Sequence, residues 1–174
     1  MRFPALCWLV ACSAVLAGCG GGPTRYSPPE QHLRFRPHGL PASEFLAMDD
    51  PNLRSAVVKD VNVNEQSPWK WTGRDPELRF HLPSSDNWTF VVEFVINDRT
   101  FRDTGPVTVS FFVNDHMAGE EQYTSYGDKS FEKFIPADWL KGREETRVRM
   151  RIHPVWPNNG ANLGVLLKRV GFVE

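Results

Sequence analysis

Three polar stretches of the chain carry side chains suited to binding a sugar. The apolar C–H face of a sugar ring packs on an indole ring, and a few fixed polar groups hydrogen-bond the hydroxyls. A tryptophan next to polar residues is therefore a candidate platform, although tryptophan in a small domain more often packs in the core or at its rim. We expect these residues in turns: Trp71 with Arg74 and Asp75 in one, Trp156 with Asn158, Asn159 and Asn162 in another, and Asn114 with Asp115 and His116 at a third polar tip.

A row of three arginines could hold an anionic ligand. Arg147, Arg149 and Arg151 alternate with apolar residues, so they project from one face of an expected strand. Guanidinium groups in a row could bind acidic glycans, lipopolysaccharide phosphates or teichoic acid. The alternative is a solvated face whose arginines pair across the sheet with carboxylates. The carboxylates considered for this pairing are Glu93, Glu77 and Glu132.

The sequence offers no arrangement typical of an enzyme. It contains no nucleophile elbow, zinc-protease helix, phosphate-binding loop or dinucleotide glycine pattern. Glu120 and Glu121 are adjacent carboxylates, but neighbours on a strand point to opposite faces, and a glycosidase needs two that converge. The histidines are scattered without metal-ligand spacing. We therefore expect a non-catalytic protein with no cofactor and no metal site, and a hydrolytic role has the least support.

The N-terminus combines an apolar run with a cysteine. Residues 3–17 are apolar apart from Ser13, which is too short for an ordinary membrane-spanning helix. Residues 16–19 read LAGC, and this stretch resembles the lipobox of bacterial lipoprotein precursors at every position. The resemblance implies that Cys19 becomes the lipidated mature N-terminus and anchors the protein in a membrane. The alternative is a plain secretory signal with a coincidental cysteine.

The lipobox resemblance has two further implications. Cys7 and Cys12 fall in the segment that would be removed, which leaves no thiol for a disulfide or a cysteine metal cluster. Gly20 after the anchor favours the outer membrane if the cell is Gram-negative.

Removing residues 1–18 takes away one charge, that of Arg2, and changes the net charge from -1 to -2. We therefore expect no nucleic-acid partner.

The remaining chain divides into a tether and a β-domain. We predict a signal peptide over residues 1–18, a lipidated cysteine with a flexible proline- and glycine-rich tether over 19–50, and a β-sandwich over 51–174. Short apolar pieces of the tether, including Phe45, Leu46 and Met48, could dock on the domain. Period-two alternation and turn-forming breakers predict seven or eight short strands in an all-β, two-sheet antiparallel sandwich. The strands are expected within residues 56–63, 77–82, 88–96, 107–113, 130–135, 147–152 and 164–173.

Five stretches follow one another along the β-domain: WKWTG (69–73), LRFHLP (78–83), VTVSFFVND (107–115), FIP (134–136) and LGVLLKRVGF (163–172). In this order they resemble the galactose-binding-like jelly rolls found as carbohydrate-binding modules. The resemblance implies sugar binding through loops at one end of the sandwich or across a sheet face, but it transfers no invariant binding residue.

Two hypotheses of different classes follow. In the first, a lipid-anchored, non-catalytic sandwich binds glycan at the bacterial cell envelope, through Trp156 or Trp71 in preference to the other tryptophans. In the second, the protein is a structural or assembly lipoprotein that docks on an envelope protein complex, with the arginine row at the interface.

Overall fold

The computed structural model describes residues 44–64 and 66–174 of the chain. All of them belong to one compact unit, residues 37–174. Cys19, the predicted signal peptide and most of the predicted tether lie outside the described residues. None of the described helices is long and apolar enough to cross a membrane.

The described chain folds into an antiparallel β-sandwich, which confirms the predicted fold class. Sheet A has the strand order β1-β11-β4-β7, and sheet B has the order β2-β3-β8-β5-β6. Sheet A consists of β1 (Phe45–Ala47), β4 (Thr89–Ile96), β7 (Gly127–Phe134) and β11 (Leu166–Val173). Sheet B consists of β2 (Val57–Val61), β3 (Lys70–Phe80), β5 (Val107–Val113), β6 (His116–Tyr123) and β8 (Thr146–His153).

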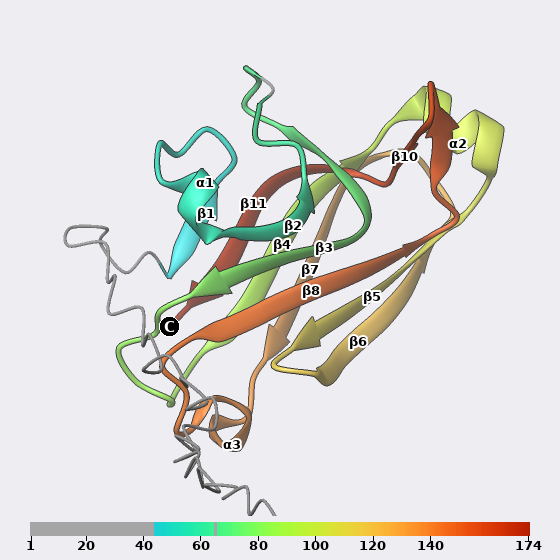
Figure 1. The fold of residues 1–174 in the computed structure, drawn as a ribbon. Helices are drawn as coiled ribbons and strands as arrows, with labels where there is room; N and C mark the ends of the chain where they lie inside the picture. Colours follow the sequence, from blue (N-terminus) through green and yellow to red (C-terminus); the bar gives the residue numbers. More distant parts are fainter. Residues whose placement is uncertain (1–43, 65) are drawn as a thin grey trace, which may run out of the picture. The chain divides into compact units, whose positions relative to one another are not determined.

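Strand β3 belongs to both sheets. Its first residues pair with β11 of sheet A, and residues from Glu77 onward pair with β8 of sheet B. Between Thr72 and Glu77, no residue of β3 is paired with a neighbouring strand in the described structure. Pro76 lies in this interval, where the strand changes partners. Proline lacks a backbone donor and is tolerated at such a break in a ladder. Because β3 joins sheet A to sheet B, the nine strands of the described residues that belong to these sheets form one continuous sheet. This sheet is nearly closed, like a barrel (Figure 1).

Three short helices and a small hairpin complete the fold of the described residues. Helix α1 covers Leu53–Ala56, α2 covers Asp98–Thr104 and α3 covers Ala137–Leu140. Strands β9 (Trp156–Asn158) and β10 (Ala161–Leu163) pair in a hairpin of their own. Figure 1 shows α2 beside this hairpin at one end of the sandwich and α3 at the other end.

The core forms from the alternating apolar residues that predict the strands. Val148, Met150 and Ile152 of β8 are almost fully buried, as their period-two spacing indicates. Phe111 of sheet B stacks on Phe131 of sheet A, with ring centroids 3.9 Å apart. The two sheets thus share one hydrophobic core, and their outer faces are left for other contacts.

Two sequence-based assignments need adjustment. Trp71, Arg74 and Asp75 were expected in a turn because Pro76 follows them, but all three lie within β3. Inside the predicted tether, Leu46 and Met48 are buried and β1 pairs with β11, so the sandwich includes residues before 51. Strand β6 and the β9–β10 strands were not predicted, because their side chains do not alternate cleanly between polar and apolar.

Candidate functional site

The side chain of Trp156 is fixed at the α2 end of the sandwich. Its indole N–H donates to the Asp103 Oδ2 at 2.8 Å, and the Arg99 guanidinium lies 5.4 Å from its ring centroid. Both charged residues belong to α2, whose N-cap Asn97 accepts hydrogen bonds from the Arg99 and Thr100 amides. The indole is nevertheless partly exposed. Trp156 is thus a preorientated aromatic surface rather than a core residue.

The β9–β10 hairpin gathers the polar residues predicted around Trp156. Trp156 pairs with Leu163 and Asn158 pairs with Ala161, so Trp156 and Asn158 point to the same face of the hairpin. Asn159 has a φ of 47° and Gly160 one of 83°, which form the two-residue turn between the strands. We name Arg99, Asp103, Trp156, Asn158 and Asn159 the Trp156 cluster. It combines an aromatic ring, amides and a charge of each sign within one end of the fold.

Trp71 lies on a strand that meets this end but is not part of the cluster. Trp71 is half-buried and pairs with Leu166 of β11. Its neighbour Thr72 accepts a hydrogen bond from the Gly164 amide at 2.8 Å, directly after the hairpin. Arg74 is exposed on β3, and the Asp75 carboxylate pairs with Arg151 at 3.3 Å. The predicted Trp71 stretch is therefore spread along a strand instead of converging in a loop.

The Asn114 stretch lies at the opposite end of the sandwich, next to α3. Asn114 and Asp115, with φ values of 47° and 69°, form the two-residue turn between β5 and β6. Asn114 is buried, and its amide donates to the Trp139 carbonyl at 2.9 Å and accepts from the Arg147 amide at 2.8 Å. His116 is exposed and stacks on Trp139, with centroids 4.7 Å apart. These residues do not meet the Trp156 cluster.

The arginine row lies on the outer face of sheet B, as its alternation predicts. Arg147 pairs with Glu77 at 3.3 Å and with Glu145 at 3.0 Å, and hydrogen bonding to Glu145 raises the pKa of Arg147. Arg151 pairs with Asp75 at 3.3 Å. Pairing across the sheet thus applies to two of the three arginines.

Of the three carboxylates that the sequence suggested as partners of the arginine row, one forms such a pair in the structure. Glu77 is a partner of the row, but Glu93 pairs with Arg169 within sheet A. Glu132 makes no ion pair with the row among the described residues, since it lies on β7 of sheet A.

Arg149, in the middle of the row, is held differently. Its guanidinium carbon lies 4.5 Å from the centroid of the Phe112 ring on the neighbouring strand β5. Among residues 44–64 and 66–174, it makes no ion pair and no side-chain hydrogen bond. Within the part of the chain that the structure describes, it is the one arginine of the row whose N–H donors have no partner.

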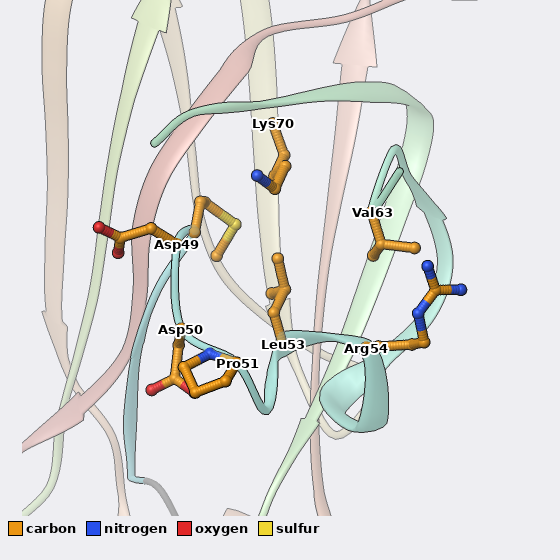
Figure 2. Close-up of a pocket in the computed structure, with 8 residues that line it drawn as sticks. Asp49, Asp50, Pro51, Leu53, Arg54, Val63 and Lys70 are labelled. Carbon is orange, nitrogen blue, oxygen red and sulfur yellow. The ribbon is translucent and has the colours of Figure 1, made fainter. Parts of the chain in front are cut away.

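A small hollow lies apart from all of these residues, between β1, α1 and the start of β3. It encloses about 170 Å³. Figure 2 shows Asp49 and Asp50 on one side, Arg54 and Val63 on the other and Lys70 between them. The buried Lys70 ammonium donates to the Ser67 carbonyl. Because charges of both signs line it, the hollow selects no class of ligand.

Two residues of the Trp156 cluster are not predicted from the sequence. Arg99 and Asp103 lie more than fifty positions before Trp156, and no periodicity connects them to it. The Asn97-Asp98 pair, a typical helix start, was the available signal that α2 exists. No group of three or more His, Cys, Asp or Glu residues in the described ranges could hold a metal ion.

Comparison with known proteins leaves the family open. No protein-family model and no curated protein matches the chain. Among solved structures, it is similar to a family GH115 4-O-methyl-α-glucuronidase with specificity for decorated arabinogalactans, at 10% identity and a TM-score of 0.42. That match covers 78% of this chain but 18% of the glucuronidase.

A second similar structure is the CBM36-1 domain of a multidomain xylanase from the hindgut metagenome of Trinervitermes trinervoides. It is 15% identical with a TM-score of 0.31, and the match covers 59% of this chain and 75% of that domain. Similarities of this size carry no inference about ligands.

Proposed function

We propose that this protein is a lipid-anchored, non-catalytic component of the bacterial cell envelope that binds glycan through the Trp156 cluster. The observation that carries the binding role is the fixed, partly exposed indole of Trp156 beside Asn158 and Asn159. An orientated ring loses little conformational freedom when a sugar packs on it, and the amides can donate to and accept from hydroxyls.

The anchoring part of the proposal comes from the sequence. Residues 16–19 follow an apolar run and have the lipobox form, with Gly20 after the cysteine. Two or three acyl chains give stable membrane attachment, whereas one chain is marginal. In this proposal Cys19 places the sandwich at the envelope, in the outer membrane if the cell is Gram-negative.

Anchoring is tested by Cys19→Ala in cells grown with a labelled fatty acid. We expect the wild type to incorporate label and to fractionate with membranes, and the variant to lose the label and remain unprocessed. A mature, membrane-bound and labelled variant would contradict the assignment.

Glycan binding is tested with the full chain, purified in detergent, on a glycan array and in a cell-wall pulldown. We expect binding that Trp156→Ala removes and that Trp69→Ala retains. Trp69 is the matched control, because it is 43% exposed and outside the cluster. Undiminished binding by Trp156→Ala would remove the site, and no binding to any glycan would count against the function.

A second candidate function, docking on an envelope protein complex, is favoured by one apolar feature of sheet A. Phe134 is 60% exposed and Val173 is 41% exposed, and both pair with Thr89 in the same cross-strand row. A photo-crosslinker at position 134 would capture a stoichiometric protein partner in native membranes if this function holds. Recovery of saccharide without protein favours the first proposal.

A further inference from the structure

Among the described residues, the outer face of sheet B holds one arginine, Arg149, that forms no ion pair. Lys59 and Arg147 share Glu77, and Arg151 has Asp75. Each of these cations is therefore screened by a carboxylate on β3. Arg149 lies between Arg147 and Arg151 on the same face of β8, yet it has no carboxylate within ion-pair distance in the described ranges.

The position of Arg149 is nevertheless well defined. Its guanidinium rests on the ring of Phe112, which is itself 9% exposed. The Arg151 guanidinium also lies over this ring, at 5.7 Å, so two guanidinium groups contact the same aromatic side chain. A guanidinium stacked in this way keeps its N–H edge free for a planar anion, which it can bind through two parallel hydrogen bonds.

The surroundings of Arg149 combine apolar and polar groups. Met117, which pairs with Phe112 across β5 and β6, is 55% exposed. On the other side, the Ser110 hydroxyl donates to the Glu120 carboxylate at 2.7 Å, and Ser110 pairs with Arg151. The face therefore offers a cation for an acid group, a thioether side chain for a C–H surface, and carboxylate oxygens that accept from hydroxyls.

Charge balance favours a carboxylate over a phosphate. Glu77, Asp75 and Glu120 lie on the same face as Arg149. Like charges repel, and a phosphate monoester carries nearly two negative charges. These carboxylates would therefore repel it about twice as strongly as they repel a carboxylate ligand. A single unpaired guanidinium also balances one negative charge, not two.

We propose that Arg149 forms an anion-binding site on the outer face of sheet B whose ligand is a uronate residue of an acidic glycan. This inference rests on the proposed glycan-binding function and gives it a substrate class. Met117 packs against the sugar ring, and Glu120 accepts from its hydroxyls.

The test compares a galacturonate trimer with its carboxyl-reduced, neutral counterpart by calorimetric titration of the full chain in detergent. The variants are Arg149→Gln, Arg149→Lys and the control Arg169→Gln. Arg169 lies on the other sheet and pairs with Glu93. Near-ultraviolet circular dichroism and the unfolding midpoint establish that each variant is folded.

We expect the wild type and Arg169→Gln to bind the acidic trimer about tenfold more tightly than the neutral one, the size of effect that a lost charge-assisted hydrogen-bond pair has. Arg149→Gln should lose this preference, and Arg149→Lys should keep part of it. An unchanged preference in Arg149→Gln would overturn the inference. So would Arg149-dependent binding of inorganic phosphate that is as tight as binding of the acidic trimer.

The proposed function can fail separately. If the wild type binds both trimers equally and Trp156→Ala removes that binding, the uronate site is wrong and glycan binding stands. If neither trimer nor any array glycan binds, the proposed function itself is contradicted.

Discussion

The two ends of the sandwich use similar residues for different purposes. At the α3 end, Asn114 is buried and hydrogen-bonds two backbone groups, and His116 covers Trp139. At the α2 end, Trp156 is tied through its indole N–H, while Asn158 and Asn159 face the surface of a two-residue turn. Both ends have an aromatic ring, amides and a positive-φ turn.

The difference between the ends shows how to separate folding residues from binding residues. The Asn114 side chain is 3% exposed and holds a backbone group at each of its two polar atoms, so a ligand cannot reach its remaining N–H and lone pair. At the α3 end the polar side chains hold the chain in place. At the α2 end the fold uses the indole N–H of Trp156, whose partly exposed ring also lies 5.4 Å from the Arg99 guanidinium. Within the described residues, no hydrogen bond holds the side chain of Asn158 or Asn159. The following changes test this contrast between the two ends.

The largest effect is expected from removing the Asn114 side chain. Asn114→Gly should lower the free energy of unfolding by about 1–3 kcal/mol, because the Trp139 carbonyl and the Arg147 amide lose the buried side chain that pairs with them. Asn114→Ala should cost about 1–2 kcal/mol more, since alanine is strained at a φ of 47°. Urea unfolding measures both.

Glycan affinity provides the control for the Asn114 variants. The folded Asn114→Gly protein should bind glycan as the wild type does. A stable variant that no longer binds would show instead that Asn114 is part of a binding site.

An intermediate effect is expected at Asp103. Asp103→Ala should lower the free energy of unfolding by at most about 1 kcal/mol, because this hydrogen bond is exposed. It should weaken glycan binding several-fold, since the indole loses its fixed orientation. Asp103→Asn keeps an acceptor for the indole N–H and should retain most of the affinity. Equal affinity in all three proteins would mean that the tie to α2 does not matter for binding.

The smallest effect is expected at His116. His116→Ala removes an exposed ring that stacks on Trp139, so a loss of about 0.5 kcal/mol is expected, at the low end for aromatic pairs. Thermal unfolding detects the loss, and glycan affinity should not change. A clear fall in affinity would place a ligand at the α3 end and remove the contrast between the two ends.

The sequence predicts local features of this fold well. Alternation predicts which residues of β8 face the core. Val148, Met150 and Ile152 can all be buried only when the same face of the strand is turned toward the core. The same alternation correctly places Arg147, Arg149 and Arg151 on one outer face. The segment Asn158-Asn159-Gly160 likewise indicates the turn that carries two residues of the Trp156 cluster.

Partners that are distant in sequence could not be predicted. Arg169 rather than the arginine row takes Glu93, because the register of β11 against β4 decides which side chains meet. Trp71 was assigned to a turn because a strand that changes sheets at a proline resembles a break in the sequence. The tie between Trp156 and Asp103 depends on a seven-residue helix, which is too short for a periodic signal.

Glycan binding at the Trp156 cluster is tested most directly by following the indole N–H resonances of the protein by NMR while saccharide is added. Substitution of each tryptophan assigns the resonances. We expect the Trp156 indole signal to shift progressively to saturation, while that of Trp139, at the other end of the sandwich, stays in place. A neutral glycan that saturates the protein and leaves the Trp156 signal unmoved would contradict the claim that the Trp156 cluster is the binding site.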